Sequence, residues 1–233
     1  MNNKTATRLD IVDWQALADE TLARLERPAD VANHFFAAPP TVPRYAIGKN
    51  NETAQLHALA PLQGIIDDFA APASSWRGIP LVKTNNVPKG ALVANCSTSI
   101  SPVAVLGHLA AHGLTQVVGL HQLIVASAGK LAWPWFAESM RRELDEHADE
   151  WRRIHHTLAD EESRRIVLDV VRFRLSCDPG YMKNYKVRVQ DQYFEDFMQF
   201  NKEIFVDAGG FDGDTSEGFV KRYPLHAAVV RAE

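Results

Sequence analysis

A glycine-rich loop behind an acidic residue is the part of the sequence best suited to chemistry. It lies in residues 203–233, which read EIFVDAGGFDGDTSEGFVKRYPLHAAVVRAE. The apolar run 204–206 is suited to a strand buried on both faces, and Asp207 follows at its carboxyl end, where open α/β sheets bind ligands. Gly209 and Gly213 allow a close approach of the backbone to a ligand that a Cβ would block. These residues predict a small-molecule site.

The residues after the loop predict a helix and a second strand. Asp214 and Glu217 form a D-x-x-E capping box, so a helix is expected from about Thr215. The exposed N–H groups of its first turn favour a carboxylate or a phosphate. A strand over residues 227–230 leads to Glu233, where an acidic side chain can accept hydrogen bonds from two ribose hydroxyls.

The spacing of the loop separates it from a dinucleotide site. The dinucleotide fingerprint is G-x-G-x-x-G, whereas this loop is D-x-G-G-x-x-G. Asp207 would also place a negative charge beside a pyrophosphate, and it suits a ligand that carries an amino group and a sulfonium. The alternative is a glycine turn without a ligand. The coincidence of the acid, the spaced glycines, the cap and the terminal acid favours a ligand site.

Two other constellations have simpler explanations. His108 and His112 lie four residues apart on an expected helix, but no glutamate follows the first histidine as in H-E-x-x-H, and no third ligand is evident. A histidine pair at a helix end or surface is favoured, and no metal site is predicted. Cys96 follows an expected strand without a base or an electropositive setting, so we expect a small, partly buried residue.

A strand–helix–strand pattern occurs near the N-terminus. A strand over residues 44–47, a turn at Gly48, a helix over 52–62 and a strand over 64–66 lead to the acidic pair Asp67-Asp68. The turn could hold the phosphate of a nucleotide or nucleotide-sugar. A single glycine is a weak signal, so a degenerate Rossmann-like scaffold or acceptor-recognition module is the favoured alternative.

The remaining elements follow from periodicity and from glycine and proline positions. A helix is expected over residues 10–25, capped by Asp10 or Asp13, and a proline-rich linker over 38–43. Further strands are expected at 78–82, 91–94 and 116–120, and a helix at 102–112. Residues 135–175 predict charged helices that link two α/β units. Their expected apolar stripe consists of Ile154, Leu158, Ile166, Val167, Val170 and Phe173.

Composition excludes several classes of protein. The 233 residues are 46% hydrophobic and 23% charged, with a net charge of −4, so electrostatics give no reason to expect nucleic acid or an anionic membrane as partner. The start MNNKTATRLD has no apolar stretch typical of a signal peptide, and the longest apolar runs are too short to span a membrane. With two distant cysteines, the sequence predicts a cytoplasmic protein.

The residues of the loop carry a family resemblance. The run 205–216, FVDAGGFDGDTS, resembles the first motif of the FkbM family of methyltransferases. Residues 159–165, 173–175, 181–182 and 192–197 resemble the segment that precedes this motif in two-domain members. Residues 67–69 and 78–80 are similar to parts of their N-terminal Rossmann-like domain. The resemblance covers most of the chain, and the terminal motif is its specific part.

The resemblance implies S-adenosylmethionine as cofactor and assigns roles to particular residues. Its cofactor-binding residues would be Asp207, Gly209, Gly210, Gly213, Thr215 and Glu233, with Tyr193 as a further candidate unless that ring packs in the core. Thr215 would face the methionine carboxylate and Glu233 would hold the ribose. The reaction would transfer a methyl group to an oxygen of a sugar or polyketide-like acceptor. No catalytic base is identified among the residues present.

The predicted fold class is α/β. We expect an N-terminal helical segment and linker over 1–40, a Rossmann-like domain over 41–130, a helical bridge over 131–200, and the first βαβ unit of a class I methyltransferase sheet over 201–233. The family continues past the acidic residue for several more strands, so we expect an incomplete chain that is inactive alone. The alternatives are a non-catalytic nucleotide- or nucleotide-sugar-binding module, and a homo-oligomer or other assembly in which another chain completes the C-terminal unit.

Overall fold

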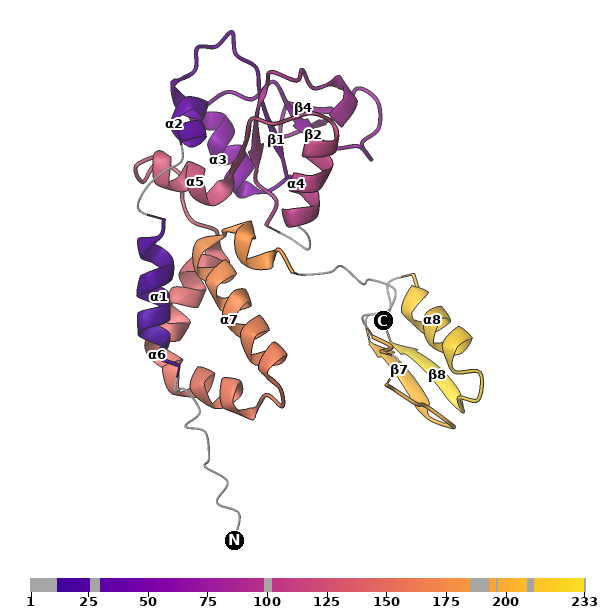
Figure 1. Cartoon of the computed structure of the whole chain (residues 1–233). Helices are drawn as coiled ribbons and strands as arrows, with labels where there is room; N and C mark the ends of the chain where they lie inside the picture. Colours follow the sequence, from indigo (N-terminus) through magenta and orange to yellow (C-terminus); the bar gives the residue numbers. More distant parts are fainter. Residues whose placement is uncertain are drawn as a thin grey trace. The chain divides into compact units, whose positions relative to one another are not determined.

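The computed structural model divides into two compact units, Met1–Tyr185 and Lys186–Glu233 (Figure 1). It describes residues 12–25, 30–98, 102–184, 193–195, 197–208 and 212–232. The domain boundaries expected after residues 40, 130 and 200 stay predictions. No helix within the described ranges is long and apolar enough to cross a membrane.

The first unit contains a six-stranded sheet with a Rossmann-like strand order. Its strands are β1 (Arg44–Ile47), β2 (Gly64–Ile66), β3 (Ser75–Trp76), β4 (Ile79–Val82), β5 (Leu92–Asn95) and β6 (Val117–Gly119). They lie in the order β3-β4-β2-β1-β5-β6, and every pair is parallel except β3 with β4. The expected mixed α/β fold is therefore confirmed. The short edge strand β3 was not predicted.

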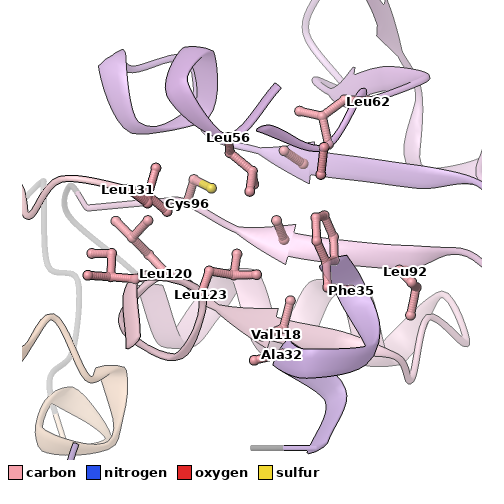
Figure 2. Packing of buried hydrophobic residues seen from close by; sticks show 14 of the residues in the cluster. Ala32, Phe35, Leu56, Leu62, Leu92, Cys96, Val118, Leu120, Leu123 and Leu131 are labelled. Atoms are coloured by element: carbon pink, nitrogen blue, oxygen red, sulfur yellow. The ribbon is translucent and has the colours of Figure 1, made fainter. Parts of the chain in front are cut away.

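Helices cover both faces of this sheet. They are α2 (Asp30–Ala37), α3 (Asn51–Leu59), α4 (Pro102–Ala111) and α5 (Leu120–Ala126). Strand β5 shows how the faces differ: Leu92 and Ala94 pack with side chains of α2, α3 and α5, whereas Val93 packs with Leu109 of α4. Figure 2 shows the first of these clusters, with Cys96 inside it. Because both faces are apolar, all four residues of β5 are buried.

A second cluster in the same unit joins helices that are distant in sequence. Helix α1 (Trp14–Ala23), capped by Asp13, packs with α6 (Trp135–Thr157) and α7 (Glu161–Ser176), and Trp14 is almost fully buried among them. The expected stripe on α6 and α7 is wrong in part, because three of its residues are more than a third exposed. These are Ile154, Ile166 and Val170. The buried positions are instead Met140, Leu144, Val171 and Leu175.

In α7, which holds Ile166 and Val170, apolar side chains occupy neighbouring positions, and the buried face is the one that carries Val171 and Leu175. For Ile154 the physical reason lies in α6. His147 has non-helical angles (φ −129°, ψ 27°), so the helix is kinked there. A kink changes the direction of every side chain that follows, and a single helical phase no longer describes the whole element. The buried face of α6 therefore cannot be extrapolated from the residues after His147 to those before it.

The second unit is a βαβ motif built on aromatic packing. Strands β7 (Ile204–Ala208) and β8 (Ala228–Ala232) pair in parallel, and α8 (Asp214–Arg222) connects them (Figure 1). Phe219 of α8 is 1% exposed and stacks on Phe205 of β7, with ring centroids 4.3 Å apart. The three elements thus share one small apolar core.

Two local expectations in this unit are wrong. Ile204 and Val206 are 65% and 59% exposed, because α8 covers only one face of the described β7–β8 pair. The capping box is also absent: Gly213, in the left-handed region with φ +88°, precedes the helix, and Asp214 is already its first residue. The Asp212 carboxylate accepts a hydrogen bond from the Asp214 N–H at 3.2 Å instead.

Candidate functional site

Asp207 lies at the carboxyl end of β7 and is tied to the helix that follows. Its side chain is on the face covered by α8, and the residue is 8% exposed. The Ser216 hydroxyl, 1% exposed, donates a hydrogen bond of 2.6 Å to Asp207 Oδ2. This bond joins the strand to the first turn of α8. It therefore links the residues on the two sides of the glycine loop.

Arg231 of β8 lies beside the same loop. Its guanidinium donates to the Gly213 carbonyl oxygen at 3.4 Å. A Cβ on residue 213 would come within 2.5 Å of Arg231 Cζ. The positive φ favours glycine here, and a side chain at this position would also displace the Arg231 guanidinium. The result is a cation next to the N-terminus of α8.

A hollow of about 530 Å³ opens between α8 and β8. It is lined by Ser216, Glu217, Val220, Lys221, Val229 and Arg231. Two cations and one carboxylate thus border an otherwise apolar wall. A ligand with both an ammonium and a carboxylate has partners of opposite charge at this position.

The structure brings together some of the sequence-predicted residues. Asp207 and Gly213 lie at the two ends of the loop, and the Thr215 N–H donates to Asp214 Oδ1 at 2.7 Å. Tyr193 is 57% exposed and contacts Phe194 edge-on, with ring centroids 6.4 Å apart. It does not line the hollow. The predictions at Gly209, Gly210 and Glu233 fall outside the described residues, so their roles stay predictions.

Ser216 and Arg231 are site residues that the sequence reasoning missed. Each had a signal. Ser216 lies three and seven residues before Phe219 and Tyr223, which places it on the buried face of a helix. Arg231 lies two residues after Val229, and alternate residues of a strand share a face, so it points to the α8 side.

The other candidate groups have ordinary structural roles. His112 Nδ1 lies 2.8 Å from the His108 carbonyl oxygen, and the described residues include no group of acids, histidines or cysteines arranged to hold a metal. The bond from His112, which directly follows the last residue of α4, fits the expected histidine pair at a helix end. Cys96 is fully buried, and burial raises the pKa of its thiol to about 12. A thiol in that setting is not a nucleophile at neutral pH.

The two units can be compared with known proteins once their folds are described. The first unit is a Rossmann-like α/β unit, and the second is a separate βαβ motif with a buried acid at the end of its first strand. No family model matches the sequence, and no curated protein matches it.

One solved structure does match. It is the crystal structure of methyltransferase FkbM from Methylobacillus flagellatus KT, which is 16% identical and aligns with a TM-score of 0.57 over 94% of this chain and 63% of that one. This chain is thus structurally similar to a member of the family whose motif its sequence resembles, and it spans less than two thirds of that protein's length. At this identity the likeness shows a shared fold.

Proposed function

We propose that this chain is part of a methyltransferase that binds S-adenosylmethionine at the glycine loop between β7 and α8. The observation that carries the proposal is the buried Asp207–Ser216 pair at the carboxyl end of a parallel strand. The shared fold with methyltransferase FkbM supports the same assignment.

The residues present fit the amino-acid end of that cofactor. Gly213 lets the Arg231 guanidinium approach the backbone, and Arg231 supplies a cation for the methionine carboxylate. Asp207 supplies the negative charge for the cationic part. When bound, the cofactor provides an electrophilic methyl group on a sulfonium. The chain's own contribution would be to fix the position of that methyl group relative to an acceptor.

The acceptor follows from the family resemblance alone. We propose a small molecule or glycan, methylated on an oxygen, and no nucleic acid or membrane as partner. Turnover by this chain alone is not expected. The β7–β8 pair has a helix on one described face, and its other face exposes Ile204, Val206 and Val230. Parallel sheets of this class are covered on both faces, so an active enzyme needs more packing than the described residues supply.

Calorimetry with S-adenosylhomocysteine tests the cofactor assignment. We expect the full chain to bind it, and to bind 5′-methylthioadenosine, which lacks the amino-acid end, more weakly. Arg231→Gln should weaken the binding of S-adenosylhomocysteine by about tenfold, the equivalent of one charge-assisted hydrogen bond of roughly 1.5 kcal/mol. It should leave the affinity for 5′-methylthioadenosine unchanged. Lys202→Gln, which removes an exposed cation of the same unit that does not border the hollow, is the matched control.

Two results would contradict the proposal. One is equal affinity for both ligands in the parent chain and in Arg231→Gln, which would mean that the loop does not hold the amino-acid end. The other is an absence of binding by a chain whose circular dichroism is that of the folded protein. Turnover of labelled S-adenosylmethionine on a panel of hydroxylated acceptors would instead contradict only the expected inactivity.

A further inference from the structure

A second cavity lies in the first unit, at the carboxyl edge of its sheet. Its volume is about 810 Å³, within the range of small-molecule sites. It is lined by residues that follow β1 and β2, with Leu81 of β4 and His108 of α4. All of the lining residues belong to Met1–Tyr185, whereas the proposed cofactor loop belongs to Lys186–Glu233.

The topology of the sheet places this cavity where α/β proteins bind ligands. From β1 the chain moves first to β2 and β4 on one side, and later to β5 and β6 on the other. The strand order therefore reverses at β1. In open sheets of this type the ligand crevice lies outside the carboxyl ends of the strands at that reversal. The cavity lies at this reversal, on the side of β1 that carries β2 and β4.

The polar groups at this edge are arranged around one ion pair. Lys49 Nζ lies 2.7 Å from Asp67 Oδ2, and Asp67 Oδ1 accepts the N–H of Phe69 at 2.9 Å. An ionised carboxylate has about four acceptor positions and an ammonium has three donors. Both groups therefore keep capacity for a ligand. Asp67 directly follows β2, the second strand of the βαβ motif. An acidic residue at that position binds a ribose hydroxyl in nucleotide sites.

The exposure of Phe69 is not explained by packing within the unit. It lines the cavity and is 99% exposed. A phenyl ring gains nothing from full exposure, and its apolar area is available to a flat ligand. Stacking of a base on such a ring is a common mode of nucleotide binding.

A metal site is not the explanation for the acids at this edge. Asp68 uses Oδ1 to accept the Thr84 N–H at 2.8 Å and Oδ2 to accept its hydroxyl at 2.7 Å. His108 Nε2 lies 2.9 Å from the same Oδ2. This network fixes Asp68 in a structural role. No cluster suited to a metal occurs among the described residues.

We propose that this cavity binds a ribonucleotide, with its base on Phe69, its ribose hydroxyls on Asp67 and its phosphate beside Lys49. The ligand class includes free nucleoside phosphates and nucleotide-sugars, which share these three groups. The site is independent of the proposed methyltransferase function, since it uses other residues in the other unit.

Calorimetry on the full chain with AMP, ADP and UDP-glucose tests the proposal and separates the two sources. At least one of them should bind, and its 2′,3′-dideoxy analogue should bind more weakly. Phe69→Ala should weaken binding about 5- to 100-fold. Asp67→Asn should abolish the preference for the ribose form. Trp135→Ala and Asp149→Asn, which alter an exposed ring and an ion-paired acid of α6, should change nothing.

Three results would overturn the proposal. The first is the absence of binding at millimolar nucleotide in a folded chain. The second is nucleotide binding that survives both Phe69→Ala and Asp67→Asn. The third is self-association of the chain that Phe69→Ala abolishes, which would assign the ring to a protein contact. Loss of S-adenosylhomocysteine binding in Arg231→Gln, measured in parallel, would report on the other site and leave this one unaffected.

Discussion

The carboxyl group of Asp207 has a structural partner whether or not a ligand lies above it. Its bond to Ser216 crosses from strand to helix, and both side chains are buried. The motif therefore combines two tasks in one residue: it closes the loop and it supplies charge at the loop. Removing Asp207 would disturb both tasks at once. Arg231 and Ser216 are better positions at which to separate them.

Substitution of Ser216 by alanine should loosen the loop. The change removes a hydroxyl that donates to Asp207 Oδ2 and leaves a buried acceptor short of a bond, at a cost of about 1–3 kcal/mol. Hydrogen exchange of the amides in α8 should speed up accordingly. Thr215→Ala is the control, because the Thr215 hydroxyl makes a long, exposed contact of 3.3 Å with its neighbour Asp214. Equal exchange in both variants would mean that the buried bond stabilises nothing.

The ion pair between Lys49 and Asp67 in the first unit leads to a prediction about acid pH. The hydrogen bond from Lys49 lowers the pKa of Asp67, and the Phe69 N–H contributes in the same direction. A carboxyl whose pKa is lower in the folded state stabilises the fold above its ordinary pKa, near 3.9, and loses that contribution as the pH falls through the folded value. Lys49→Met should therefore raise the pKa of Asp67 toward the ordinary value.

Carboxyl-carbon NMR through an acid titration measures this shift residue by residue. Asp68 is an internal control, since its pKa is lowered chiefly by the Thr84 N–H and should not respond to Lys49→Met. A pKa of Asp67 that is the same in both proteins would show that the ammonium does not act on the carboxylate. A shift shared equally by Asp68 would instead point to a general change in the field.

At the scale of elements, the strands that the sequence predicts are those whose side chains are buried on both faces of the sheet. The strands at β1, β2 and β5 are short apolar runs covered on both faces, and such runs are visible in a sequence. The edge strand β3 has two residues, and its pairing with β4 depends on the turn at Arg77, with φ +50°. A pattern that short has no period to detect.

The candidate site shows a similar limit. The glycines and the acid of the loop are recognisable by type and spacing, whereas the start of α8 depends on one backbone angle. Gly213 adopts φ +88°, and this shifts the helix start to Asp214. The composition fits a capping box equally well, and only the geometry distinguishes the two. Ser216 and Arg231 act through tertiary contacts between helix, strand and loop, which local spacing indicates only by face.

Helix α8 should depend on one aromatic ring. Phe219 is 1% exposed and lies against Phe194, Phe205 and Tyr223, with ring centroids between 4.3 and 5.8 Å away. Phe219→Ala should cost roughly 3–5 kcal/mol, enough to unfold a unit this small. Amide exchange across β7 and β8 should become fast. Val220→Ala, at a 43% exposed position on the same helix, should leave exchange slow.

At the scale of the whole molecule, each unit has its own apolar core. Three clusters of buried side chains belong to Met1–Tyr185, and the fourth, around Phe219, belongs to Lys186–Glu233. A unit that buries its own core can fold and unfold by itself. The two proposed ligands would therefore act on different parts of the chain.

The tryptophans make this separation measurable, because all five lie in the first unit. We expect two unfolding transitions: one followed by tryptophan fluorescence, and one followed by amide exchange of β7, α8 and β8. A ligand that binds only a folded unit stabilises that unit by RT ln(1 + [L]/Kd), about 2.7 kcal/mol at a hundredfold excess over Kd. S-adenosylhomocysteine should shift the second transition alone, and a ribonucleotide should shift the fluorescence transition alone.

Phe219→Ala provides the control, since it should remove the second transition and leave the fluorescence midpoint in place. A single transition that both probes follow, and that either ligand shifts, would show instead that the two units unfold as one cooperative body.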